Sequence, residues 1–290
     1  MAEKHVDEVS GIETTGHVWD GDLRELNKPL PKWWLYVFYV SIIWSIGYWI
    51  VYPAWPTLNG YTKGIWGYSQ RQTVTDEIAA AKARQTKFVE GIKATPLADI
   101  QKKPDLFAFA RAGGAAAFGD NCAPCHGRGA AGTVGYPNLN DDDWIWGGRL
   151  ADIEKTLLHG IRSTHASTRI SDMPKFGVDK LLKDSEISDV AEYVLSLSRR
   201  STDAAAVPRG EKVFAQQCAS CHGKDGKGMQ QQGGPNLTDG IWLYGGRRAD
   251  IVESIRTGRG GVMPHWEGRL DPVTIKMLTV YVHSLGGGVK

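Results

Sequence analysis

The chain has 290 residues, which is enough for about two domains that each bury a core. Its formal net charge of +2, without a run of lysine or arginine, excludes an electrostatic argument for nucleic-acid binding. The 35 glycines make up about 12% of the residues, against a usual share of about 7%, and this excess predicts extensive loops.

The N-terminal part of the chain predicts a membrane anchor. Residues 1–32 form a polar tail, and residues 33–52, WWLYVFYVSIIWSIGYWIVY, then run without a charge. As a helix this run spans the hydrocarbon core, and its ends are rich in tryptophan and tyrosine, as membrane interfaces prefer. It begins too late and is too long for a cleaved signal peptide. We therefore expect one retained transmembrane helix rather than a buried core helix.

Residues 53–104 predict a linker that contains one helix. Prolines and a glycine end the membrane helix, and a helical pattern runs over residues 75–93 with Thr75 as N-cap. Its apolar residues approximate a stripe, so the helix either docks on a neighbouring surface or serves as a free spacer.

From residue 105 onward the sequence repeats itself. GAAAFGDNCAPCHG matches GEKVFAQQCASCHG, SDMPKF matches GVMPHW, and AEYVLSL matches TVYVHSL. The repeat predicts two homologous domains, at residues 105–200 and 205–290. Each begins and ends with a helix, and a glycine on the first helix predicts close packing of first helix against last within each domain.

The cysteines occur in two C-x-x-C-H motifs, made of Cys122, Cys125 and His126, and of Cys218, Cys221 and His222. Two thiols beside a histidine suit covalent attachment of haem c, with the histidine as an iron ligand. A four-cysteine zinc site is the second interpretation, but the gap between the pairs is long and both histidines would be unexplained. Two redox disulfides are the third interpretation. The duplicated histidine favours two covalently bound haems.

Two methionines are candidates for the second axial ligand of each iron. Met173 and Met263 occupy matching positions, each followed by a proline, and a thioether there saturates the iron and favours electron transfer. An open position would instead permit peroxide or gas binding. His159, His165 and His265 compete for this role, but none has a counterpart in the other copy.

The surroundings of each haem are also predicted from the repeat. The carbonyls of Pro137 and Pro235 are expected to accept from the ring N–H of the two ligand histidines. Further candidates lie in the matching segments that follow: Trp144 and Trp242 as haem walls or propionate donors, and Arg149 and Arg247 as propionate partners.

With these features, the chain resembles the CcoP/FixP family, the dihaem subunit III of cbb3-type cytochrome c oxidases. The leader HVWDGDLRELNKPLPKWWLYVFY is similar to that family's entry into the membrane. The resemblance implies a mainly α protein with one N-terminal transmembrane helix and two tandem class I cytochrome c domains. It also implies His126 and His222 as proximal ligands and Met173 and Met263 as distal ligands. We assume that each methionine serves its own domain, although the sequence leaves an exchange open.

The implied function is electron transfer. A donor cytochrome c would deliver electrons, and a monohaem subunit and a haem-copper subunit that reduces oxygen and pumps protons would be partners. Covalent haem attachment implies haem domains in the periplasm and an N-terminus in the cytoplasm, anchored in a bacterial inner membrane. The alternatives are a dihaem cytochrome c of another respiratory reductase, and a dihaem peroxidase or gas sensor if one iron is open.

Overall fold

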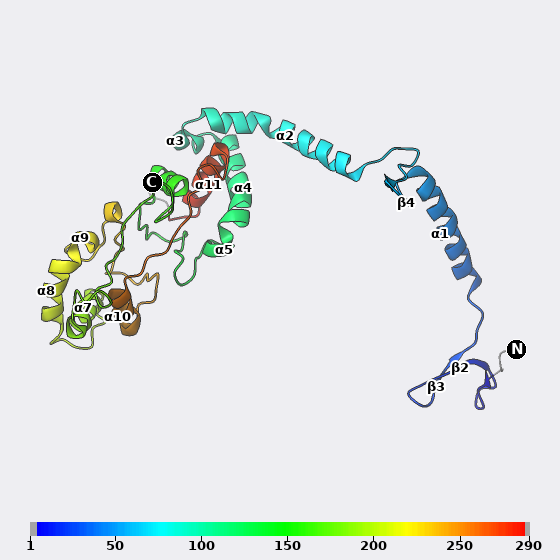
Figure 1. Cartoon of the computed structure of the whole chain (residues 1–290), viewed down its shortest axis with the longest axis horizontal. Helices are drawn as coiled ribbons and strands as arrows, with labels where there is room; N and C mark the ends of the chain where they lie inside the picture. Colours follow the sequence, from blue (N-terminus) through cyan, green and yellow to red (C-terminus); the bar gives the residue numbers. More distant parts are fainter. Residues whose placement is uncertain (1–4, 288–290) are drawn as a thin grey trace. The chain divides into compact units, whose positions relative to one another are not determined.

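The computed structural model describes residues 5–287 and divides into two compact units, residues 1–83 and 84–290 (Figure 1). The first unit holds a small sheet and the apolar helix. The second unit holds both C-x-x-C-H motifs. The described chain is mainly helical, as the sequence predicts.

The polar tail contains regular structure that the sequence analysis missed. Strands β1 (His5–Val6), β2 (Glu13–Trp19) and β3 (Leu23–Leu26) form an antiparallel sheet in that order. Asp20, Gly21 and Asp22 connect β2 to β3, and the first two have positive φ angles, which hairpin loops commonly require. The Asp-Gly pair was the available signal, but the weak alternation of apolar and polar residues around it hid the strands.

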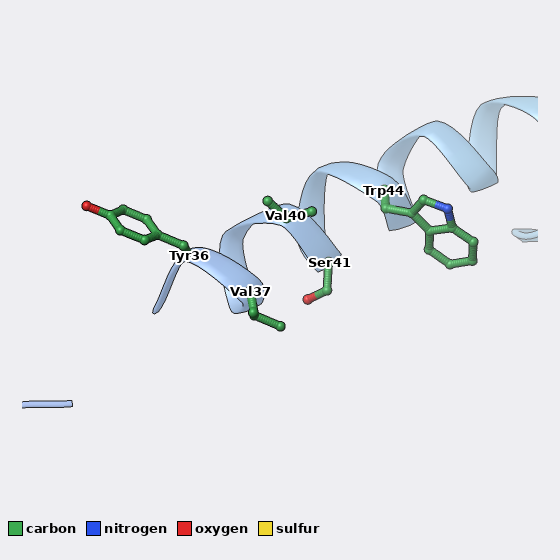
Figure 2. Close-up of a pocket in the computed structure, with 5 residues that line it drawn as sticks. All are labelled: Tyr36, Val37, Val40, Ser41 and Trp44. Carbon is green, nitrogen blue, oxygen red and sulfur yellow. The ribbon is translucent and has the colours of Figure 1, made fainter. Parts of the chain in front are cut away.

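Helix α1 (Lys32–Val51) matches the predicted anchor within one residue at each end. None of its side chains is buried, and Figure 2 shows a shallow, mostly apolar groove on one face, lined by Tyr36, Val37, Val40, Ser41 and Trp44. An apolar helix without protein around it fits a lipid-embedded anchor. A short hairpin of β4 (Pro56–Thr57) and β5 (Gly60–Tyr61) follows.

Helix α2 (Gln70–Ala94) begins five residues before the predicted helix, because Ser69 rather than Thr75 precedes its first turn and accepts from the Gln72 amide. The last turns of α2 belong to the second unit and pack against its other helices. Ile92 is fully buried with Ile100 of α3 (Leu97–Ile100) against helices further along the chain. The docking interpretation therefore holds for the end of α2.

The second unit consists of two helical lobes. The first lobe contains the first motif and comprises α4 (Pro104–Asn121), α5 (Ala123–His126), α6 (Leu150–His159) and α11 (Pro272–His283). The second lobe contains the second motif and comprises α7 (Asp184–Leu197), α8 (Val207–Gln217), α9 (Ala219–His222) and α10 (Arg248–Thr257). A 3-10 turn, η1 (Gln230–Gln232), lies in the loop after α9.

The two repeats exchange their last helices, which contradicts the expected packing of first helix against last within each copy. Helix α4 of the first copy packs on α11 of the second, and α8 of the second copy packs on α7 of the first. At both crossings a glycine makes the approach possible: a Cβ on Gly114 would overlap the Tyr281 Cβ, and one on Gly210 would overlap the Tyr193 Cβ.

The repeat itself explains why the sequence did not reveal the exchange. Phe118 contacts Tyr281 with ring centroids 5.4 Å apart, and Phe214 contacts Tyr193 at 5.0 Å. Both crossings thus use the same residue types at the same positions. A last helix of either copy satisfies either first helix, so local patterns do not distinguish the two pairings.

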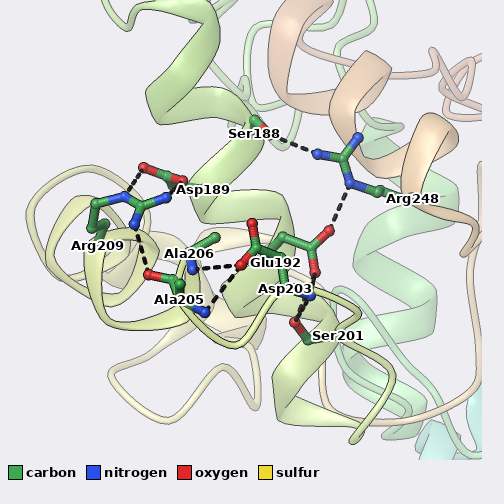
Figure 3. Close-up of polar contacts among 9 residues, drawn as sticks. All are labelled: Ser188, Asp189, Glu192, Ser201, Asp203, Ala205, Ala206, Arg209 and Arg248. Carbon is green, nitrogen blue, oxygen red and sulfur yellow. Dashed lines mark hydrogen bonds and ion pairs between the residues drawn. The ribbon is translucent and has the colours of Figure 1, made fainter.

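A buried carboxylate holds the exchanged helix α7 in the second lobe (Figure 3). Glu192, with 2% of its side chain exposed, forms an ion pair with Arg248 of α10 at 2.7 Å. Its second oxygen accepts hydrogen bonds from the Ser201 hydroxyl and from the backbone amides of Thr202 and Asp203. One side chain therefore joins α7, the connection between the repeats and α10.

The hydrogen bonds keep Glu192 ionised. Burial alone would raise the pKa of this carboxyl, but the donors around it outweigh burial and lower the pKa to about 2. Since the folded pKa lies below the unfolded value, the stability from Glu192 is fully present above pH 4.5 and is lost as pH falls through about 2.

We expect Glu192→Gln to lower the free energy of unfolding by about 3 kcal/mol at neutral pH, because it leaves Arg248 and three other donors poorly paired. Denaturant titrations of both proteins across pH would measure this, and the difference should shrink as the solution is acidified from about pH 4 towards pH 2. Arg209→Gln is the matched control, because its pair with Asp189 also holds α7, here against α8, but the Arg209 side chain is 58% exposed and the pair should contribute less. A difference that is independent of pH would contradict the assigned role.

Candidate functional site

Each C-x-x-C-H motif lies where a long helix ends in a single tight turn. Cys122 follows α4, and α5 then places His126 one turn further on, with the His126 amide donating to the Cys122 carbonyl at 2.9 Å. Cys218, α9 and His222 repeat this arrangement, with the corresponding distance at 3.0 Å. The turn brings both thiols and the imidazole of each motif close together.

The predicted proline contacts are confirmed. His126 Nδ1 donates to the Pro137 carbonyl at 3.0 Å, and His222 Nδ1 donates to the Pro235 carbonyl at the same distance. A carbonyl only accepts, so Nδ1 carries the proton and Nε2 has a free lone pair. Burial lowers the pKa of both imidazoles, which keeps them neutral and able to bind a metal.

Glycines allow the proline loops to return to the motifs. A Cβ on Gly132 would overlap the backbone of residues 136–138, and one on Gly234 would overlap the Cys221 carbonyl. Gly132 also has a φ of +66°, which side chains rarely adopt. The close approach of these loops sets the position of the carbonyls that orient the two histidines.

The methionines lie in exchanged lobes. Met263 packs against the core of the first lobe, which includes Cys122, and Met173 packs against the core of the second lobe, beside Cys218. Gly160 after α6 abuts the Met263 carbonyl, and Gly258 after α10 abuts the Met173 carbonyl. The packing therefore contradicts the assumption that each methionine lies with the motif of its own repeat.

The predicted tryptophans and arginines have different surroundings. Trp144 Nε1 donates to the Gly287 carbonyl, whereas the buried Trp242 Nε1 has no partner among residues 5–287. Arg149 and Arg247 are 74% and 86% exposed and pair with carboxylates of the helices that they precede, Asp152 and Asp250. Their role as propionate partners stays a prediction, and the structure gives both arginines a local function.

Two other arginines, which the sequence analysis did not single out, form a matched pair. Arg169 lies over the Trp146 ring at 5.2 Å, and Arg259 lies over the Tyr244 ring at 5.3 Å. Both precede a methionine by four residues, in RISDMP and RGGVMP. That repeated R-x-x-x-M-P spacing was a usable signal.

The aromatic partners of these arginines contact the opposite motif loop. A Cβ on Gly233, in the loop after Cys221 and His222, would overlap the Trp146 ring. Tyr244 lies near Gly135, whose amide donates to the Leu243 carbonyl at 2.8 Å in the loop after the first motif. Each arginine–aromatic pair therefore lies beside the motif of the other repeat, as does the methionine that follows its arginine.

A helix that ends in C-x-x-C-H, a histidine held by a proline carbonyl and a Met-Pro segment packed against the same core define c-type cytochrome domains, here two in one chain. Family models agree: "Cytochrome c" matches residues 112–198, "Cytochrome C oxidase, cbb3-type, subunit III" matches 205–282, and "N-terminal domain of cytochrome oxidase-cbb3, FixP" matches 11–59.

Full-length relatives specify the family. A cbb3-type cytochrome c oxidase subunit FixP from Bradyrhizobium sp. (strain ORS 278) is 56% identical, with 98% of each chain covered. A subunit CcoP from Azospirillum brasilense is 54% identical over 99% of this chain and 100% of its own, and one from Cereibacter sphaeroides is 50% identical over 95% of both chains. The chain belongs to the CcoP/FixP family of cbb3-type cytochrome c oxidase subunits.

Membership of this family implies covalently attached haem c in both cytochrome domains, and the residues present fit it. Each motif offers two thiols and an imidazole Nε2. Trp242 Nε1 and Arg169 Nε are buried donors without a partner among the described residues, as donors to a bound acid group would be in its absence. The sequence-based prediction of two haems c is confirmed at the level of the family.

We expect Gly234→Ala to reduce covalently bound haem from two per chain towards one, because the new Cβ would push the Pro235 loop away from Cys221. A pyridine haemochrome assay on the purified chain would measure this. Gly240→Ala is the matched control, since nothing lies within 4 Å of a Cβ at that glycine. Full haem content in Gly234→Ala would contradict the tight loop.

Proposed function

We propose that this chain accepts electrons from a periplasmic donor cytochrome and passes them to the haem-copper subunit of a cbb3-type oxidase, which reduces oxygen and pumps protons. The observation that carries the proposal is the packing of one methionine against the core beside each motif, Met263 with Cys122 and Met173 with Cys218, in a chain that matches CcoP/FixP subunits along its length. A monohaem cytochrome subunit would complete the relay.

The ligand sets follow the exchange. His126 Nε2 and the Met263 thioether would hold the first iron, and His222 Nε2 and the Met173 thioether would hold the second. The haem supplies one-electron chemistry between ferrous and ferric iron. Two occupied axial positions leave no place for oxygen or peroxide, which disfavours a peroxidase or gas sensor. Neutral histidines and apolar surroundings favour the reduced state.

The proposed orientation places the N-terminus in the cytoplasm and both haem domains in the periplasm. Covalent haem attachment takes place outside the cytoplasm, and a single apolar helix, α1, separates the sheet of the first unit from the cytochrome unit along the chain. Protease added to intact spheroplasts should therefore digest residues 84–290 and spare the N-terminal sheet.

Co-purification tests the oxidase role. Mild detergent extraction of the tagged chain should bring haem b and copper in fixed ratio to haem c, and oxygen consumption with reduced cytochrome c should follow the same fractions. A chain that carries haem c alone after gentle extraction would instead indicate a cytochrome of another reductase.

We expect Met263→Ala to lower the potential of the haem bound at Cys122 and Cys125, by on the order of 100 mV, and to open that iron to carbon monoxide. Loss of a thioether removes a ligand that favours ferrous iron, while the covalent attachment is unchanged. Redox titration and carbon monoxide spectra of the ferrous protein would measure both effects. Met229→Ala, in an exposed loop, is the control.

Single-haem backgrounds identify the haem concerned. With Cys218 and Cys221 replaced by serine, only the first haem is attached, and Met263→Ala should open it while Met173→Ala should not. The reverse is expected when Cys122 and Cys125 are replaced. The opposite pattern would show that each methionine binds within its own repeat.

We infer that Arg169 and Arg259 compensate the negative charge of haem propionates. Arg169 is 10% exposed, burial lowers its pKa, and its nearest carboxylate oxygen, on Asp152, is 3.9 Å away. That carboxylate also pairs with Arg149 at 2.9 Å, and Arg169 Nε is buried without a partner among the described residues, so a further anion beside this guanidinium would stabilise it. Arg259 repeats the position in the other copy, over Tyr244.

We expect Arg169→Gln to lower the potential of one haem by about 50 mV, which corresponds to about 1 kcal/mol for a one-electron couple, because a positive charge near the haem disfavours ferric iron. Potentiometric titration would measure the shift, and Arg169→Lys should restore part of it. Arg149→Gln, at the exposed start of α6, should change neither potential. Equal shifts in both arginine-to-glutamine variants would contradict the specific role of Arg169.

A further inference from the structure

Three side chains that the cytochrome sites do not use converge at the edge of the first lobe. His159 ends α6, His165 lies in the loop after it, and Glu267 lies four residues after Met263 in the other repeat. One potential ligand atom from each lies within 4.8 Å of the other two. His165 Nε2 already contacts Glu267 Oε2 at 2.9 Å.

The histidine rings lie close together and one is unsatisfied. The rings of His159 and His165 are 4.7 Å apart at their centroids, with only 11° between their planes. His159 Nδ1 is buried and has no hydrogen-bond partner within residues 5–287. Neither hydrophobic packing nor the hydrogen bonds of the cluster account for a buried, unpartnered nitrogen on a ring that stacks on another imidazole.

We propose that His159, His165 and Glu267 bind one divalent transition-metal cation, with Zn²⁺ as the best match. Two imidazoles and one carboxylate are a borderline-soft donor set that suits zinc rather than magnesium or calcium. Water would occupy the fourth position, since the Glu267 side chain is 55% exposed. The site is thus open to exchange with the solvent, unlike a closed structural zinc site.

Binding requires a local change that the hydrogen bonds define. His165 Nδ1 accepts from the Ser167 amide at 3.0 Å, so Nε2 carries the proton that points to Glu267. A cation at Nε2 moves that proton to Nδ1 and releases the Ser167 amide, at a cost of about 1 kcal/mol. The His165 ring also has to turn out of the stack with His159. Its position on a loop allows this turn, and the cost predicts moderate affinity.

The site joins the two repeats beside a proposed iron ligand. Ile161 and Met263 exchange two backbone hydrogen bonds of 3.0 Å, and the Trp266 and Glu267 amides donate to carbonyls at the end of α6. A cation held by His159, His165 and Glu267 would tie these same two segments together. It would therefore restrain the segment that carries Met263.

Calorimetric titration of the detergent-purified full-length holoprotein with Zn²⁺ tests the proposal. We expect one Zn²⁺ per chain, and a rise of at least tenfold in Kd for His165→Gln and for Glu267→Gln. Both changes lie on partly exposed side chains and keep a polar group. His17→Gln, on the exposed strand β2, is the matched control and should bind as the unchanged protein does.

Absence of stoichiometric binding would refute the site, as would binding that both variants leave unchanged. If the variants fail to fold, hydrogen exchange on the unchanged holoprotein decides. Slower exchange with Zn²⁺ in residues 157–169 and 263–267 supports the site, and unchanged exchange there refutes it. Neither measurement depends on the haem spectrum or on the oxidase partners. Failure of the zinc site can therefore be distinguished from failure of the proposed electron relay.

Discussion

The exchange of helices between the repeats is the constraint on which the rest of the structure depends. Glycines at both crossings bring the first helix of one copy within contact of the last helix of the other, and the segments that carry Met173 and Met263 follow. The methionines, the arginine–aromatic pairs and the glycines after α6 and α10 all take their positions from this crossing. Each lobe therefore combines residues from both copies.

Electrostatic interactions fix the pairing that hydrophobic packing alone leaves ambiguous. The two helix crossings are nearly equivalent in shape, so burial of apolar area gives little preference between them. Glu192 differs, because the aligned residue of the other copy is Val280. Its buried network with Arg248 and the connection between the repeats occurs in one lobe only, and breaking a buried ion pair is costly.

The sequence predicted the chemistry better than the connectivity. The motif spacing identified the thiols and imidazoles, and the proline carbonyls were correctly expected because a ligand histidine needs its second nitrogen held. The pairing of Met173 with the second lobe was not predictable, since a repeat makes local signals identical in both copies. Arg149 and Arg247 follow glycine pairs and were proposed as propionate partners, yet Asp152 and Asp250 of the adjacent helices already form ion pairs with them. Arg169 and Arg259 could have been identified from the sequence only by comparing the two copies, in which an arginine precedes the methionine by four residues.

The exchange also has a consequence for how the cytochrome unit is made and inherited. A ribosome that has synthesised only the first copy has made a haem attachment motif without the Met263 segment and the last helix that pack against it. The first lobe is complete only when α11, near the C-terminus, has emerged. A stop codon before residue 248 would remove both α10 and α11 and would therefore damage both lobes, so a gene cut after its first copy does not encode a working monohaem protein.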